Sequence, residues 1–191
     1  MPNVMREVSR VRSTKQSPSE KDGRRNALLQ APLGKEQIHR KKLNPQYVAG
    51  FIDGEGSFSV SIGRHKTLKR GLEVRAEFEI ELRADDREIL ERICITIGCG
   101  KIYDCSYERY GWFPHVKYKI TSVKNMLEFL FPFLDAHPLQ AKKAEVYVLF
   151  REIVMMVSRK EHLTDAGFHK IEALRAEMRV RGKKAKTYGN R

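Results

Sequence analysis

Apolar and polar residues alternate along four short segments of the chain, and this alternation predicts four β-strands in two antiparallel hairpins. Residues 57–62 and 73–82 form the first hairpin, with residues 63–71 as its loop. Residues 101–105 and 116–121 form the second, and its loop carries Tyr107, Tyr110, Trp112 and Phe113. The apolar positions of the first hairpin are expected to face the core, and they are Phe58, Val60, Ile62, Val74, Ala76, Phe78 and Ile80.

The segments before, between and after these hairpins have apolar residues at helical spacing. A helix that begins near residue 45 precedes the first hairpin. The later helices are predicted over residues 85–97, over a segment capped by Ser122 and interrupted by Pro132, over 139–157, and from Thr164 or Asp165 to about Val180. The order is α-β-β-α-β-β-α-α-α. Two hairpins with helices on one face predict an α+β fold.

The first helix has the most unusual sequence, VAGFIDGEG over residues 48–56. Asn44-Pro45 predicts its start, with a side-chain cap followed by proline in the first turn. Gly50 and Gly54 share one helix face with Ala49 beside them, so that another helix backbone can approach closely. Glycine in a helix costs about 1 kcal/mol relative to alanine, which indicates a compensating contact. Spacing alone fits equally well a short core helix that ends in a glycine turn.

Glu55 falls at the predicted C-terminus of this helix, where the helix macrodipole disfavours an anion. A carboxylate at this end is better placed if a cation binds it. Magnesium prefers carboxylate and carbonyl oxygens, and the adjacent Gly54 carbonyl is a second candidate ligand. Asp53 points to another side of the helix and is either a second acid or, in preference, a structural hydrogen-bond acceptor.

The nine-residue pattern resembles the LAGLIDADG motif of homing endonucleases, with conservative changes at the first, fourth, seventh and eighth positions. The resemblance extends through most of the chain from Leu43. It implies an αββαββα fold with an antiparallel DNA-binding sheet, here followed by extra C-terminal helices. It also implies site-specific double-strand cleavage of a long pseudo-palindromic target, with Mg²⁺ as cofactor and Mn²⁺ as a substitute. Glu55 occupies the position of the family's metal-binding acid.

Members of the family with a single motif act as homodimers, and only one motif is present here. The resemblance therefore implies a homodimer whose motif helices pack through their small residues. The dimer interface is expected to contain Ala49, Gly50, Asp53 and Gly54.

The other active-site positions of the family depart from its pattern. A lysine common after the second hairpin aligns with His137, and Lys142 and Lys143 lie about one helical turn beyond it. A glutamine and an arginine of the family align with Leu82 and Asp86. These departures motivate an alternative, namely an RNA maturase or a DNA-binding regulator that cuts weakly or not at all. The predicted catalytic residues are Glu55, His137 and Lys142, and the predicted metal ligands are Glu55 and Gly54.

The polar face of the strands, together with the first loop, is predicted to contact the DNA major groove. A plainly solvated sheet face is the alternative. The residues expected to contact DNA are Ser59, Ser61, Arg64, Lys66, Lys69, Arg70, Arg75, Glu77, Glu79, Lys101, Tyr103, Lys117 and Lys119.

The net charge of +13 favours a polyanionic partner, with nucleic acid first and an anionic membrane second. A general basic RNA-binding protein is therefore a third possibility. No apolar run approaches a membrane span, and no signal-peptide pattern is present. Three cysteines without a C-x-x-C pair indicate reduced thiols, in a bacterial cytoplasm or an organellar matrix.

Charge also divides the chain. Residues 1–42 hold 11 Lys+Arg and 4 Asp+Glu, and they are predicted to be a basic, disordered tail. Residues 43–181 are predicted to form one domain, and residues 182–191 a basic C-terminal tail.

Overall fold

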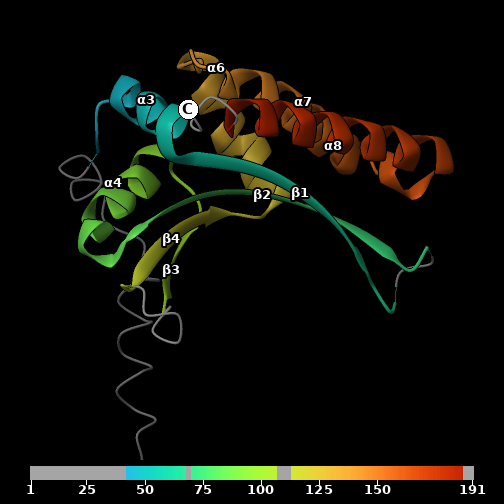
Figure 1. Ribbon diagram of the computed structural model, residues 1–191, viewed down its shortest axis with the longest axis horizontal. Helices are drawn as coiled ribbons and strands as arrows, with labels where there is room; N and C mark the ends of the chain where they lie inside the picture. The colour runs from blue at the N-terminus through green and yellow to red at the C-terminus, as the bar shows by residue number, and fades with distance from the viewer. Residues whose placement is uncertain (1–41, 68–69, 107–112, 187–191) are drawn as a thin grey trace, which may run out of the picture. The chain divides into compact units, whose positions relative to one another are not determined.

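The computed structural model describes residues 42–67, 70–106 and 113–186 (Figure 1). The predicted basic tail lies outside the described residues except for Lys42. The same holds for Lys69 and for Tyr107, Tyr110 and Trp112 of the aromatic loop. Within the described residues, no helix combines the length and the apolar character that a membrane crossing requires.

Helix α3, Pro45–Glu55, begins where the sequence predicts, because the Asn44 side chain accepts a hydrogen bond of 2.8 Å from the Gln46 backbone N–H. The helix ends directly in a strand at Gly56. A Cβ atom at this position would lie 2.7 Å from the carbonyl oxygen of Ile52, so only glycine permits the abrupt change from helix to strand.

The two predicted hairpins are confirmed. They consist of β1 (Gly56–Arg64) with β2 (Leu72–Arg83), and of β3 (Lys101–Cys105) with β4 (His115–Ile120). Strands β2 and β4 pair antiparallel and join the hairpins into one sheet with the order β1-β2-β4-β3. Phe78 therefore lies between Phe58 on β1 and Ile120 on β4, at the centre of the apolar face.

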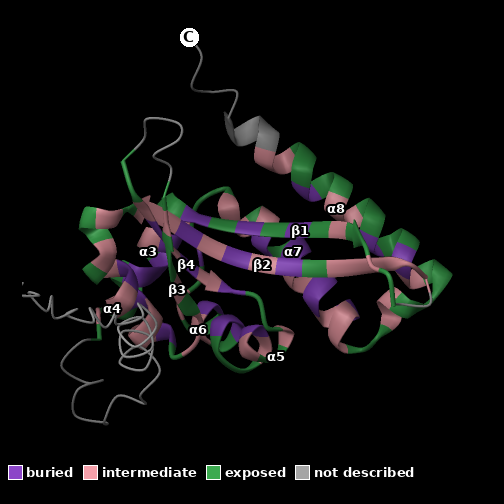
Figure 2. Cartoon of the chain, turned by 90° about the horizontal axis from the view of Figure 1, so that it is seen from below, coloured by how far each residue is buried: buried purple, intermediate pink, exposed green. Residues whose placement is uncertain are grey.

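Helices α4 (Arg87–Ile97), α7 (Lys143–Ser158) and α8 (Asp165–Lys186) belong to the layer on this apolar face, as Figure 1 shows. Figure 2 views the sheet from the other side, where no described helix covers the central strands. Phe58 packs against Phe78, Tyr147 and Phe150, with ring centroids 5.1–5.3 Å apart, so that the sheet and α7 share one core. The predicted α+β fold is confirmed.

The structure corrects the prediction that Pro132 interrupts a helix. Helical structure continues through α5 (Val123–Asn125), the π-helical segment η3 (Met126–Leu130) and α6 (Phe131–Ala136). Pro132 falls in the first turn of α6, directly after the wider π-helical turn. Its missing N–H is tolerated there, because the hydrogen-bond ladder changes register at this point.

Two helix boundaries also differ from the sequence prediction. Helix α7 begins at Lys143 and not at residue 139, because Gln140 and Ala141 donate their backbone N–H groups to a side chain of α3. Helix α8 continues to Lys186, beyond the expected end near Val180. Arg181 forms ion pairs with Glu177 on the same helix and with Glu145 on α7. These pairs stabilise the last turns of α8, where the sequence has no apolar periodicity to predict a helix.

Candidate functional site

The face of α3 that carries Gly50 and Gly54 is not covered by any other described part of the chain. Gly50 and Gly54 are exposed, and a Cβ atom built on either would meet nothing within 4 Å. Tyr47, one helical turn before Gly50 and Phe51, is 50% exposed on the same side. Ala49 points the other way, since it is only 4% exposed and faces the chain's own core, which argues against its predicted interface role. The open face is therefore formed by glycine with an aromatic side chain beside it.

Glu55 is the last residue of α3, as predicted, and its side chain is exposed. The helix leaves carbonyl oxygens without intrahelical partners at this end. A lysine of α7 approaches these carbonyls: Lys143 Nζ donates to the oxygens of Ile52 at 3.0 Å and Gly54 at 2.9 Å. The chain itself thus supplies a cation to the carbonyls of this helix end, whereas a cation bound to the Glu55 carboxylate stays a prediction.

Burial lowers the pKa of Lys143, while the negative charges of Asp53 and Glu55 act in the opposite direction. A half-buried ammonium held by two carbonyls and near two carboxylates is positioned more firmly than a surface lysine. Two of its three N–H donors are used within the chain, so one remains for a further acceptor. Lys142, the residue predicted to be catalytic, precedes it in the chain and is exposed.

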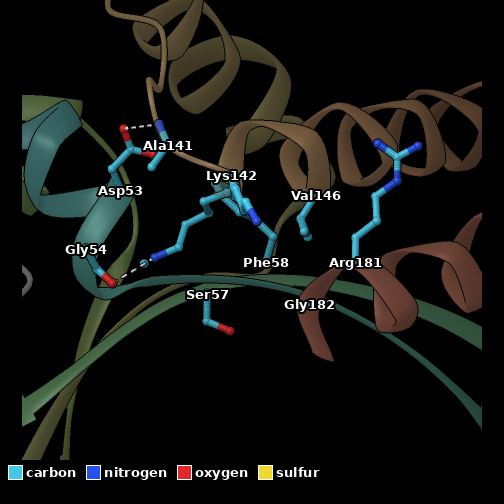
Figure 3. Close-up of a pocket in the computed structure, with 11 residues that line it drawn as sticks. Asp53, Gly54, Ser57, Phe58, Ala141, Lys142, Val146, Arg181 and Gly182 are labelled. Carbon is cyan, nitrogen blue, oxygen red and sulfur yellow. Dashed lines mark hydrogen bonds between the residues drawn. The ribbon is translucent and has the colours of Figure 1, made fainter. Parts of the chain in front are cut away.

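Asp53 positions this lysine. Its Oδ2 atom accepts hydrogen bonds from the backbone N–H groups of Gln140 at 2.6 Å and Ala141 at 3.1 Å, as Figure 3 shows for Ala141. The carboxylate therefore ties the turn before α7 to the end of α3. The interpretation of Asp53 as a structural acceptor is confirmed. Its membership of a dimer interface stays a prediction.

His137 lies at the other end of α3. Its Nδ1 atom is 3.3 Å from Nε2 of Gln46, and its ring packs on Phe133 with centroids 5.1 Å apart. Gln46 precedes Glu55 by nine residues, which corresponds to about 13 Å along a helix axis. This geometry argues against the predicted catalytic role of His137. The sequence pattern failed here because the turn before α7 carries the histidine away from Glu55 and brings Lys143 in.

A cavity of about 450 Å³ opens beside these groups, between the ends of α3 and α8 and the starts of β1 and α7. Its lining combines the backbone of the motif with basic side chains from two helices, and Figure 3 shows Arg181 and Gly182 of α8 across the cavity from Gly54. The basic lining residues are Lys142, Lys143 and Arg181. Such a cavity suits an anionic group.

The oxygen ligands at this site fit a hard divalent cation in kind but not yet in number. Glu55 offers an exposed carboxylate, and the Gly54 carbonyl has one lone pair left beside Lys143. Among the described residues, no group of three or more His, Cys, Asp or Glu side chains is arranged to hold a metal ion. A single chain therefore offers too few oxygen ligands for such a cation among its described residues.

The residues predicted to contact DNA from the strands do share one face. Cross-strand neighbours on it include Ser59 with Glu77, Ser61 with Arg75, Glu79 with Lys119, and Tyr103 with Lys117. Arg64 and Lys66 are exposed at the tip of the first hairpin. Glutamates and lysines on this face form ion pairs with one another. The alternation of apolar and polar residues predicts the face but not these pairs.

Arg70 departs from this arrangement. It forms an ion pair of 2.6 Å with Asp165, donates to the carbonyl of Leu163 and lies over the ring of Phe168 at 5.0 Å. These contacts attach the first hairpin to the start of α8 on the helix side of the sheet. They argue against the predicted DNA contact and assign Arg70 a packing role.

Replacing Lys143 with methionine is expected to lower the free energy of unfolding by about 1–2 kcal/mol, because two charge-assisted hydrogen bonds at a helix C-terminus are lost. Methionine keeps most of the apolar stem. Lys142→Met is the matched control, and its effect should stay within about 0.5 kcal/mol, as for an exposed residue. Urea unfolding of both variants measures the difference. Equal stabilities would mean that the ammonium does not hold the end of α3.

Comparison with known proteins places this geometry in a family. A family model described as LAGLIDADG endonuclease matches residues 48–154, from the glycine helix to α7. The chain therefore belongs to the LAGLIDADG endonuclease family, and the predicted resemblance is confirmed. The match ends before α8. This last helix, which contacts Arg70 and contributes Arg181 and Gly182 to the cavity, therefore lies outside the shared region.

Individual relatives agree with this assignment. The chain is 30% identical over 140 residues to "Probable intron-encoded endonuclease 3" of Neurospora crassa, covering 73% of this chain and 25% of the relative. The chain spans between a quarter and about a third of the length of the first three curated relatives it matches.

Two solved structures share the fold. I-SmaMI bound to an uncleaved DNA target with calcium has a TM-score of 0.66 and 33% identity, over 72% of this chain and 45% of that one. I-TnaI, a homing endonuclease, has a TM-score of 0.63 and 29% identity, over 75% of this chain and 98% of that one. This chain thus corresponds to less than half of the first protein and to nearly all of the second.

Proposed function

We propose that this chain is a site-specific DNA endonuclease that acts as a homodimer and requires a divalent cation, Mg²⁺ first and Mn²⁺ as a substitute. The observation that carries the proposal is the exposed Glu55 carboxylate at the end of a helix whose glycine face is open. An acid at this end of the helix has no structural partner of its own among the described hydrogen bonds and ion pairs. It is available for chemistry.

The open glycine face supports the homodimer. Two copies of α3 that pack through Gly50 and Gly54 bring their backbones close, because no side chain separates them. A two-fold axis through this contact puts one Glu55 from each chain at the seam. Two carboxylates at the seam repel one another unless cations lie between them. The match to less than half of I-SmaMI and to nearly all of I-TnaI agrees with one copy of the domain per chain.

Each group at the seam has a distinct task in phosphodiester hydrolysis. Glu55 and the Gly54 carbonyl would hold the divalent cation, which supplies a Lewis acid and a bound water of lowered pKa. Lys143 keeps one N–H free to donate to a phosphate oxygen and so stabilises its developing negative charge. Arg181, across the cavity, adds positive charge for the DNA backbone. The uncovered sheet face follows the major groove on either side of the seam.

A binding selection followed by a cleavage assay tests the proposal. A randomised duplex library is bound in Ca²⁺, and the selected consensus is cloned into a plasmid. The plasmid should become linear in Mg²⁺ or Mn²⁺ and stay intact in EDTA, and the consensus should be pseudo-palindromic because a two-fold protein presents the same sheet to each half-site. Specific binding without cutting would favour a DNA-binding regulator. Preference for a structured RNA over any duplex would favour a maturase.

A further inference from the structure

Five charged residues form a continuous ladder on the uncovered face of β2 and β4, and we call it the Glu–Lys ladder. Its members are Glu77, Glu79, Glu81, Lys117 and Lys119. Lys119 Nζ lies 2.8 Å from a carboxylate oxygen of Glu77 and 3.0 Å from one of Glu79. Lys117 Nζ lies 2.8 Å from Glu81 and 3.7 Å from Glu79. Glu79 thus links the two lysines.

The ladder is ordered before any partner binds. The side chains of its members are only 18–32% exposed, although they lie on a face that no described helix covers. Burial lowers the pKa of Lys119, but the hydrogen bonds to Glu77 and Glu79 outweigh it and leave the pKa raised. The lysine therefore stays charged and fixed in direction. Side chains that are already fixed lose less conformational entropy when they bind.

The ladder keeps hydrogen-bonding capacity for a partner. An ammonium group has three donors, and Lys119 uses two of them on its glutamates. A carboxylate has about four lone-pair sites, so Glu77 and Glu79 retain acceptors beside the lysine. Acceptors on β2 and donors on β4 therefore lie side by side on this face, with Lys119 Nζ 2.8 Å from Glu77 and 3.0 Å from Glu79.

We propose that the Glu–Lys ladder reads a block of G·C base pairs in each half-site of the DNA target, an inference that rests on the proposed endonuclease function. Guanine presents two acceptors, N7 and O6, to a lysine in the major groove, and cytosine presents an N4 donor to a glutamate. Adenine is read best by asparagine or glutamine. Neither type occurs at the outward positions of the two strands, which are Glu73, Arg75, Glu77, Glu79, Glu81 and Arg83 on β2 and His115, Lys117 and Lys119 on β4.

Strand geometry sets the length of the block. Residues on one face of a strand are about 6.8 Å apart, twice the rise per residue. Base pairs rise about 3.4 Å, so Glu77, Glu79 and Glu81 recur at about every second base pair along a groove that the strand follows. The block should therefore cover about four to five consecutive base pairs.

The same library selection in Ca²⁺ tests the inference. The wild-type consensus should contain, in each half-site, a run of about four to five positions that are enriched in G·C. Exchanging one unit of the ladder for amides, Glu79→Gln with Lys119→Gln, should shift about two of these positions toward A·T, by about tenfold in the ratio of selected bases. The rest of the consensus should be unchanged. Circular dichroism and thermal unfolding of the variant check that its fold is retained.

A pair of similar geometry on the helix layer provides the control. Lys170 Nζ on α8 lies 2.8 Å from Glu152 on α7, and the exchange Glu152→Gln with Lys170→Gln should leave the whole consensus unchanged. A specific wild-type consensus without a G·C block, or a block that the ladder exchange does not alter, overturns the inference and leaves the endonuclease proposal intact. A library without any sequence enrichment overturns both.

Discussion

Glu55→Gln is expected to abolish cleavage of both DNA strands, with a loss on the order of 10³-fold, while DNA binding stays equal or becomes tighter. The amide removes the one exposed carboxylate at the end of α3, so the chain can no longer help hold the divalent cation. It also removes a negative charge close to the DNA phosphates, which favours binding. Cleavage of a plasmid with the selected target in Mg²⁺ and a gel shift in Ca²⁺ measure the two effects separately.

Folding should survive this substitution. Glutamine has nearly the shape of glutamate, and repulsion between the two copies of residue 55 decreases. Glu88→Gln, at an exposed position in the first turn of α4, is the matched control and should cut like the wild type. Full cutting by Glu55→Gln would refute the mechanism proposed here.

Gly50→Leu is expected to convert the dimer into monomers and to eliminate double-strand cleavage with it. A leucine side chain forces the two copies of α3 apart, whereas within one chain it meets open space, since even a Cβ atom at residue 50 contacts nothing. The melting temperature of the monomer should therefore not fall, and it can rise slightly because leucine favours helix more than glycine does. Sedimentation equilibrium measures the association, and Gly54→Leu should behave in the same way.

Gly50→Ala provides the control for this prediction. Alanine adds one methyl group, raises helix propensity by about 1 kcal/mol and still permits close approach of two helices. It should weaken the dimer much less than leucine does. A wild-type protein that is monomeric both alone and with its target DNA, and yet cuts both strands, would contradict the two-fold arrangement.

The strands and the glycine helix could be predicted from the sequence because their patterns are local. Alternation in 57–62 and 73–82 places every second residue on one face, and burial of Phe58 and Phe78 follows from it. Asn44-Pro45 and Ser122 start their helices through hydrogen bonds to residues two or three positions on. The position of Glu55 at a helix end, exposed and without a local partner, is of the same kind. These features depend on neighbours a few residues away.

The sequence could not show which basic residue reaches the carbonyls at the end of α3. Lys142 and Lys143 are adjacent lysines, so the sequence does not distinguish them. The choice between them depends on where α7 begins, which the hydrogen bonds from Gln140 and Ala141 to Asp53 determine across nearly ninety residues. The hydrogen bonds to Asp53 also fix the turn before α7, and His137 in front of this turn contacts Gln46 and not Glu55.

Patterns within single segments are sufficient to predict the set of elements, their order, the α+β class and the acid at the end of the glycine helix, because each follows from propensity and periodicity along one segment. Contacts between elements were needed to show that Lys143 holds this helix end, that Arg70 packs against α8, and that glutamates and lysines of β2 and β4 form a ladder. Such pairs are matters of distance and direction between side chains of different elements. No local pattern encodes them, since many partners of the right charge are available and packing of the common core selects one.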